Sequence, residues 1–315
     1  MTAIGVDARS VPPRALRRRE SAKAIWRSLR ADKVALAGAG YLLLVVVIVV
    51  FGDLIRPHDP AAIELRDKLI PPMFFGGTKT HILGTDPLGR DILSRIILGA
   101  RTSVSIGVAV VMLSALIGAT LGLLAGYYER WVSAVVMRLV DVVMAFPSLL
   151  LALTVLALLG PSAKTIVAVL VFNTWPVFAK SVRDEVLSMR SATFLTAAET
   201  LGCSPGRVMR RHVLPNVAPL LATVATLELA QVILAEASLS YLGFGLQPPA
   251  TSWGLMISVG QPFVTTAVWT VVFPGIALAL TILAVNIVAT WLRTSRVARI
   301  SGASVDAGLV AGDPR

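Results

Sequence analysis

The chain has 315 residues, 56% of them hydrophobic, and a mean hydropathy of +0.78. Soluble domains are about 45–50% apolar, so the composition excludes an ordinary soluble protein and indicates a polytopic membrane protein. A net charge of +11 in such a protein indicates basic loops beside anionic membrane lipid, and no nucleic-acid partner is expected.

The chain opens with a basic segment, residues 1–33, which is either a solvated tail or a helix on the membrane surface. A first transmembrane helix is expected at 34–55, an extracytoplasmic loop at 56–101, a membrane core at 102–293 and a tail at 294–315. Within the core, the predicted spans are 103–127, 133–160, 164–181, 217–243 and 267–292. The expected fold class is therefore an all-α membrane protein of about six transmembrane helices.

Six spans place both ends of the chain on one side of the membrane. Most of the 29 Lys and Arg residues lie in segments on that side, namely the two ends and the loops around 128–138 and 180–212. The positive-inside rule then predicts that both termini are cytoplasmic and that the chain is a multi-pass protein of the inner or plasma membrane.

A dense polar motif ends the outer loop. Its members are Gly84, Thr85, Asp86, Gly89, Arg90, Asp91, Ser94 and Arg95. Residues 84–86 predict a turn and a helix cap, and residues 90–95 a helix that leads into the second span. The charges are expected to form a structural Asp–Arg network. A metal set of His81 with Asp86 and Asp91 is set aside, because one histidine with scattered carboxylates is a poor transition-metal site, and no metal is expected.

The second and third spans contain features that predict packing. Gly118, Gly122 and Gly126 form a repeated small-xxx-small pattern, which predicts close approach of another helix. In the third span, Arg138 and Asp141 are three residues apart and are expected to pair, and the proline at 147 is expected to kink the helix.

The fifth predicted span carries Glu228, Gln231 and Glu236. Acidic groups within a span are costly unless they face protein or water. These three residues are the candidates for a translocation path or a subunit interface.

Between the fourth and fifth spans lies a polar island, the coupling loop (190–216). Phe194, Ala197 and Ala198 fall on one helical face, and Gly202 supplies a helix end. A second helix is expected to begin after Ser204 and to stop at Pro215. On spacing alone, an ordinary amphipathic cytoplasmic loop is the more common interpretation, because helical apolar spacing is frequent.

This loop resembles the coupling loop of ABC-importer permeases, whose pattern is Glu-Ala-Ala, three residues, Gly, nine residues, Ile-x-Leu-Pro. The corresponding residues here are Thr196, Ala197, Ala198, Gly202, His212, Leu214 and Pro215. Thr196 replaces the Glu and His212 replaces the Ile, so a role that needs the Glu is in doubt. The outer polar motif and the run from 236 to 254 resemble the signature of C-type permease subunits of dipeptide, oligopeptide, glutathione and nickel importers. The acidic motif that often ends these subunits is missing after Trp291.

The resemblance implies the ABC type I importer permease fold with a cytoplasmic coupling helix. It also implies three kinds of partner: a homologous second permease subunit, cytoplasmic ABC ATPase subunits and an extracytoplasmic solute-binding protein. The sequence has no phosphate-binding loop, so ATP hydrolysis is expected in the partner subunits, and no catalytic residue or cofactor is expected here.

The resemblance favours di- and oligopeptides as substrate, with nickel or glutathione as alternatives. The spans lack clustered His, Cys or Met, which disfavours a bare metal ion. Two other classes fit less well. An intramembrane enzyme lacks its motifs, and a stand-alone ion-coupled transporter, with Glu228, Glu236 and Asp141 as relays, would need inverted repeats that the sequence does not show.

Overall fold

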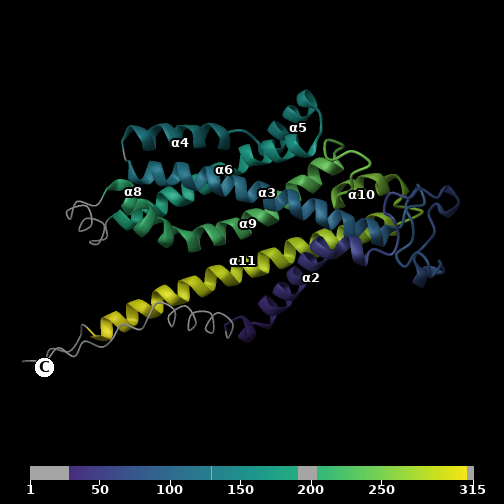
Figure 1. The fold of residues 1–315 in the computed structure, drawn as a ribbon, viewed down its shortest axis with the longest axis horizontal. Helices are drawn as coiled ribbons and strands as arrows, with labels where there is room; N and C mark the ends of the chain where they lie inside the picture. Colours follow the sequence, from purple (N-terminus) through teal and green to yellow (C-terminus); the bar gives the residue numbers. More distant parts are fainter. Residues whose placement is uncertain (1–27, 129, 191–203, 311–315) are drawn as a thin grey trace, which may run out of the picture.

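One long helix, α3 (Ile92–Tyr127), runs through the middle of the bundle (Figure 1). The computed structural model describes residues 28–128, 130–190 and 204–310, and all regular elements in these ranges are helices. Five of the helices are long and apolar enough to cross a membrane, or six spans if one bent pair counts as a single span. The all-α class and the expected number of spans are confirmed.

The first span, α2 (Lys33–Ile55), lies against α3 and against α11 (Trp269–Val310). Asp32 caps it, since its Oδ1 accepts hydrogen bonds from the backbone N–H groups of Val34 and Ala35, each at 3.0 Å. Near its outer end, Gly52 packs directly against Ile97 of α3. The helix is thus capped at its start and packed on α3 near its end, although most of its surface is apolar and exposed.

The tightest helix pair is α3 with α6 (Ala163–Arg190). A Cβ on Gly118 would lie 2.4 Å from the carbonyl oxygen of Trp175, and one on Gly122 would lie 2.5 Å from that of Ala179. Gly126 packs in the same way on Val186. The packing face predicted from the glycine spacing is confirmed, because the two backbones come closer than any side chain permits.

The predicted third span at 133–160 is not one helix. It is divided into α4 (Trp131–Met144) and α5 (Ser148–Leu159), which meet at an angle of 80°. Pro147 lies at the break, where it has no N–H to continue the ladder and disfavours helical geometry in the residue before it. The kink expected from this proline is therefore a full break between two helices.

The predicted pair of Arg138 and Asp141 does not form. Both side chains are exposed on α4, and no ion pair joins them in the described part of the chain. The helix is held instead from α6, where Arg183 Nε donates to Ser133 Oγ at 2.8 Å. An exposed i, i+3 pair contributes only a few tenths of a kcal/mol, which is too little to fix two long side chains.

The expected helix stop at Pro215 is also wrong. The chain passes from α8 (Pro205–Val208) through a π-helical turn (Met209–Val213) into α9 (Leu214–Tyr241) without a non-helical residue. The N–H of Leu214 donates to the carbonyl of Met209, five residues earlier. Pro215 thus falls in the first turn of α9, where a missing N–H is tolerated.

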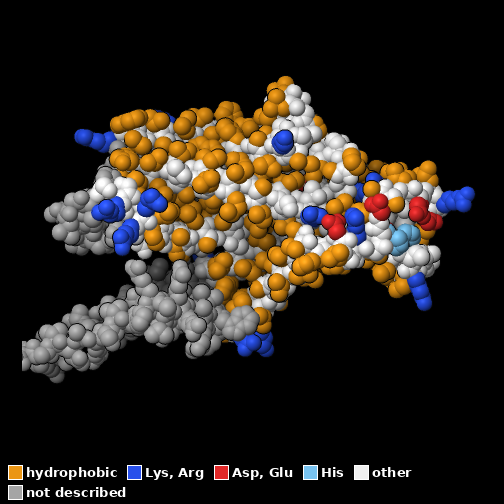
Figure 2. All heavy atoms as spheres, viewed as in Figure 1, with side chains coloured by type: hydrophobic (Ala, Val, Ile, Leu, Met, Phe, Trp, Pro, Cys, Tyr) orange, Lys and Arg blue, Asp and Glu red, His pale blue; other side chains and the backbone are white. Residues whose placement is uncertain are grey.

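The end of the bundle opposite α8 is closed by irregular chain and short helices. Two 3₁₀ turns (Leu65–Asp67 and Met73–Phe75) lie in the loop after α2, and α10 (Trp253–Gly260) with a 3₁₀ turn (Gln261–Phe263) precedes α11. Figure 2 shows an apolar surface over the middle of the molecule, Lys and Arg at the α8 end, and charges of both signs with His at the opposite end. This distribution is typical of a membrane-embedded belt with a solvent-exposed region at each end.

The close approach of α3 and α6 makes a prediction about stability. Gly122→Ala places a methyl group 2.5 Å from a backbone oxygen, so we expect it to lower the free energy of unfolding by about 1–3 kcal/mol. Thermal unfolding of the detergent-solubilised protein measures this loss. Gly40→Ala is the matched control, since its Cβ meets no atom within 4 Å and alanine favours the helix. Equal melting temperatures for the two variants would contradict the close packing.

Candidate functional site

A cavity of about 290 Å³ lies between α5, α6 and α9, in the membrane part of the bundle. Polar side chains on its lining are Ser148 of α5, Asn173 and Thr174 of α6, and Glu228, Gln231 and Ser238 of α9. Apolar residues of the same three helices complete the wall. A polar cavity inside a lipid-embedded bundle is where a hydrophilic solute finds hydrogen-bond partners.

The break at Pro147 positions one wall of this cavity. It turns the start of α5 toward α6, where Asn173 Nδ2 donates to the carbonyl oxygen of Ser148 at 3.3 Å. On α9, Glu228 is half-buried and Gln231 is exposed, one turn apart on the same face. Two of the three candidate residues of the fifth predicted span therefore share a polar cavity.

Glu236, the third candidate, lies elsewhere. Its side chain has no exposed surface, and its carboxylate accepts hydrogen bonds from Ser240 Oγ at 2.8 Å and from Ser103 Oγ of α3 at 3.0 Å. Ser252, the cap of α10, donates to Ser240 at 3.3 Å. The carboxylate joins α9 to α3 and to the start of α10, and it reaches neither the cavity nor an outer surface. Its expected place on a path or subunit interface is corrected accordingly.

The polar motif of the outer loop forms a compact charge network. Asp86 Oδ1 accepts from the backbone N–H groups of Leu88 at 2.8 Å and Arg90 at 3.0 Å. Its Oδ2 accepts from Arg90 Nε at 2.7 Å and lies 3.5 Å from Arg95 Nε. All three charged side chains are buried, so the predicted Asp–Arg network is confirmed.

The rest of the motif shapes the turn and the start of α3. The predicted cap at 84–86 is corrected, because the capping residue is Asp91, whose Oδ2 accepts from the N–H of Ser94 at 2.8 Å. Gly84 and Gly89 have φ of +82° and +76°, and a Cβ on either would strike a backbone carbonyl of the preceding loop. Thr85 holds that loop as well, since its Oγ1 accepts from the N–H of Ile70 at 2.8 Å.

Only the second half of the coupling loop lies within the described residues; Phe194, Thr196, Ala197, Ala198 and Gly202 lie outside them. Val208 and Val213 are buried, together with Val217, against Val182 and Val186 of α6. The side chain of His212 is outside the description, and Leu214 and Pro215 are exposed. An apolar face of this second helix thus packs on the end of α6.

Comparison with known proteins identifies the family. The model of the binding-protein-dependent transport system inner membrane component matches residues 118–302, and that of the N-terminal transmembrane domain of oligopeptide transport permease C matches residues 22–72.

This chain belongs to the family of binding-protein-dependent inner membrane transport components.

Several curated permeases are similar over most of their length. A dipeptide transport system permease of Alkalihalophilus pseudofirmus is 37% identical over 85% of this chain and 86% of its own. A di/tripeptide transport system permease of Pseudomonas aeruginosa is 37% identical over 90% of this chain and 93% of its own. A glutathione transport system permease of Escherichia coli is 38% identical over 88% of this chain and 90% of its own. The protein is therefore an ABC-importer permease of the inner membrane with several spans.

Among solved structures, an inward-facing MetNI methionine ABC transporter gives a TM-score of 0.49 at 17% identity, over 64% of this chain and 97% of that chain.

Sequence reasoning missed part of the permease cavity. Ser148 and Ser238 line it, although neither was singled out. Ser238 could have been found, because Glu228, Gln231, Ala235 and Ser238 are spaced three, four and three residues apart on one face of α9. Ser148 could not, since it reaches the cavity only through the break at Pro147.

The buried charge network predicts a large effect of one substitution. Asp86→Ala leaves Arg90 and Arg95 buried without their carboxylate, and we expect a loss of about 3–5 kcal/mol in the free energy of unfolding. Asp53→Ala is the control, because it removes an exposed carboxylate 2.6 Å from Arg101 and should cost about 1 kcal/mol or less. Chemical unfolding in detergent measures both. Similar losses for the two variants would show that burial does not matter here.

Proposed function

We propose that this permease subunit imports small peptides, and that the cavity between α5, α6 and α9 is its half of the translocation path. The observation that carries the proposal is a half-buried carboxylate among amide and hydroxyl groups inside an apolar bundle. A free peptide has an α-ammonium group, which can pair with the carboxylate of Glu228. Its amide groups can form hydrogen bonds with the side-chain amides of Gln231 and Asn173. The relatives named for dipeptide and di/tripeptide transport support this substrate class.

The rest of the importer is supplied by partners. A homologous second permease subunit would complete the path, a solute-binding protein would deliver the peptide from outside, and ATPase subunits would hydrolyse ATP in the cytoplasm. The sequence has no phosphate-binding loop of its own, which supports placing ATP hydrolysis in those partners. The excess of Lys and Arg at the α8 end supports cytoplasmic termini and a cytoplasmic coupling loop.

Coupling would pass through the loop at 190–216. Its second half is continuous with α9, which carries Glu228, and it packs on α6, which carries Asn173. Movement of an ATPase subunit bound to this loop would therefore reach two walls of the cavity as rigid-body motion.

Glutathione is the second candidate. It is a tripeptide with the same ammonium and amide groups, and a relative at 38% identity is named for its transport. Nickel is less well supported, because the cavity's lining residues include no His, Cys or Met. Uptake of labelled dipeptide, glutathione and nickel is measured in a strain deleted for this gene and in the same strain with the gene restored. The comparison separates the three substrates. Loss of nickel uptake alone would overturn the peptide proposal.

Glu228→Gln tests the role of the carboxylate. If it binds the α-ammonium group, the variant loses a charged hydrogen bond of about 1.5–3 kcal/mol, and KM for dipeptide uptake rises about 10- to 100-fold. An N-acetylated dipeptide, which has no ammonium group, should be transported equally by both proteins. Glu64→Gln, the same change at an exposed outer site, is the control. An unchanged KM in Glu228→Gln would remove this carboxylate from the path.

Gly202→Val tests the coupling loop. We expect normal membrane insertion and loss of uptake, because a β-branched residue cannot adopt the left-handed geometry proposed for this bend. Immunoblotting of membranes measures insertion, and uptake of labelled dipeptide measures coupling. Normal uptake by this variant would contradict the proposed bend.

A further inference from the structure

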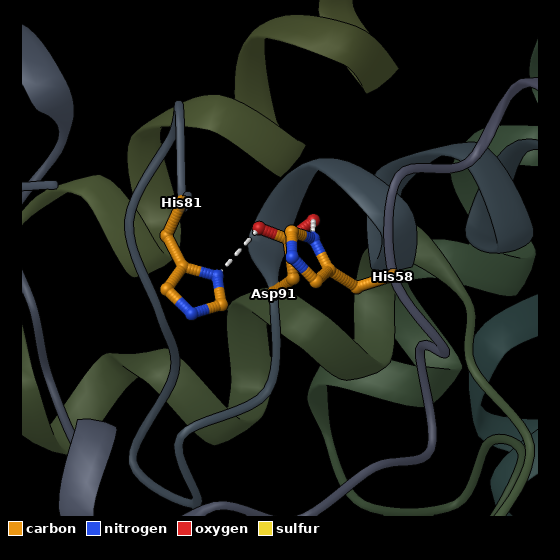
Figure 3. Close-up of side chains that lie close together, drawn as sticks. All are labelled: His58, His81 and Asp91. Atoms are coloured by element: carbon orange, nitrogen blue, oxygen red, sulfur yellow. Dashed lines mark hydrogen bonds and ion pairs between the residues drawn. The ribbon is translucent and has the colours of Figure 1, made fainter. Parts of the chain in front are cut away.

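Two histidines and one carboxylate meet in the outer loop (Figure 3). His81 Nδ1 lies 3.1 Å from Asp91 Oδ1, and His58 Nδ1 lies 3.9 Å from Asp91 Oδ2. The two imidazole rings are 4.9 Å apart between centroids and tilted by 34°. The sequence had suggested Asp86 as the companion of His81 and Asp91, but Asp86 is engaged by Arg90, and His58 takes the third place.

The surrounding contacts tie this group to the start of α3 and place a second carboxylate beside it. The backbone N–H of His58 donates to Ser94 Oγ at 3.1 Å, and the N–H of Ser94 donates to Asp91 Oδ2. On the other side, Asp67 Oδ2 lies 3.9 Å from His81 Nε2. Asp67 is thus a small movement away from the carboxylate–imidazole hydrogen bond that orients metal-binding histidines in proteins.

One nitrogen in this group lacks a hydrogen-bond partner. His58 Nδ1 is shielded from solvent, and no described residue accepts from it or donates to it, since 3.9 Å to Asp91 is too long for a hydrogen bond. A shielded polar atom without a partner is costly. A cation between His58, His81 and Asp91 would satisfy it.

We propose that His58, His81 and Asp91 bind a divalent transition-metal ion of the Zn²⁺ class. The ligand atoms all lie within 4.8 Å of one another. Zinc bonds of about 2.0–2.2 Å place tetrahedral ligands roughly 3.3 Å apart, so a small movement closes the set. His58 is the member free to move, because it lies in the irregular chain after α2 and its side chain is 38% exposed.

The donor set defines the class of ion. Two imidazole nitrogens and one carboxylate suit zinc, nickel or cobalt, whereas calcium and magnesium prefer oxygen ligands alone. The exposed side of His58 leaves a fourth position for water. None of the three residues lines the peptide cavity, so the ion is a resident ligand of the outer loop and does not depend on the proposed substrate.

Binding would join three segments of the chain. His58 follows the outer end of α2, His81 belongs to the loop that covers the bundle, and Asp91 is the cap of α3. The ion would therefore fix the outer end of the first span to the long central helix.

Zinc binding to the full-length protein tests the proposal. The protein is purified with a tag that contains no histidine, placed in lipid nanodiscs and titrated with Zn²⁺, and then with Co²⁺ as a spectroscopic probe. We expect one zinc per chain and visible cobalt bands of tetrahedral intensity. His58→Ala and His81→Ala should lose both. Asp67→Asn should retain the site with about 10- to 100-fold weaker affinity, because it removes only the orienting carboxylate.

The third histidine of the chain supplies the matched control. His212→Ala also removes one imidazole, but from the coupling loop, and it should bind zinc like the wild type. Zinc should raise the melting temperature of the wild type and not that of His58→Ala, while size-exclusion profiles show that both are folded. Absence of zinc binding in the wild type, or undiminished binding in His58→Ala and His81→Ala, would overturn the proposal.

Discussion

The close contact between α3 and α6 is the constraint on which the rest of the permease depends. In lipid, helices gain little from hiding apolar surface, so association relies on close packing and on hydrogen bonds. Gly118, Gly122 and Gly126 let two backbones meet, and the neighbouring elements are then placed from this pair. α9 packs on both helices, and α4 is hydrogen-bonded to α6. α5 forms one wall of the polar cavity. Loss of that contact would affect every wall of the cavity.

Polar groups are distributed by the solvent they meet. At the end of the bundle opposite α8, charged residues pair with one another and bind the loop to the start of α3, as Asp86 does with two arginines. Inside the bundle, Glu236 is satisfied by serine hydroxyls and connects three helices. Glu228, by contrast, faces a cavity that has room for a ligand. Two glutamates about two turns apart on α9 thus differ in role. Glu236 joins helices, whereas Glu228 is available for binding.

Much of the fold could be predicted from the sequence, because apolar length and glycine spacing act locally. The number of spans, the packing face of α3 and the Asp–Arg network follow from such patterns. The errors arose where backbone accommodation, burial or distant parts of the chain decide the outcome. Pro215 was expected to end a helix, but a π-helical turn absorbs it; Arg138 and Asp141 have helical spacing, but no burial drives them to pair. Glu236 and His58 depend on partners more than 30 residues away, Ser103 and Asp91, which no local pattern reveals.

The continuity of the chain from Pro205 to Tyr241 has a mechanical consequence. Since no non-helical residue interrupts it, this stretch is one continuous helix, with about 35 Å between Pro205 and Glu228 at 1.5 Å per residue, and its π-helical turn and Pro219 are the points at which it can bend. A non-helical break at Pro215 would have let the α8 end move independently of the cavity wall. Without such a break, movement of the α8 end would be passed along the helix to α9. In the proposed path, Glu228, Gln231 and Ser238 lie on this helix and would change position together.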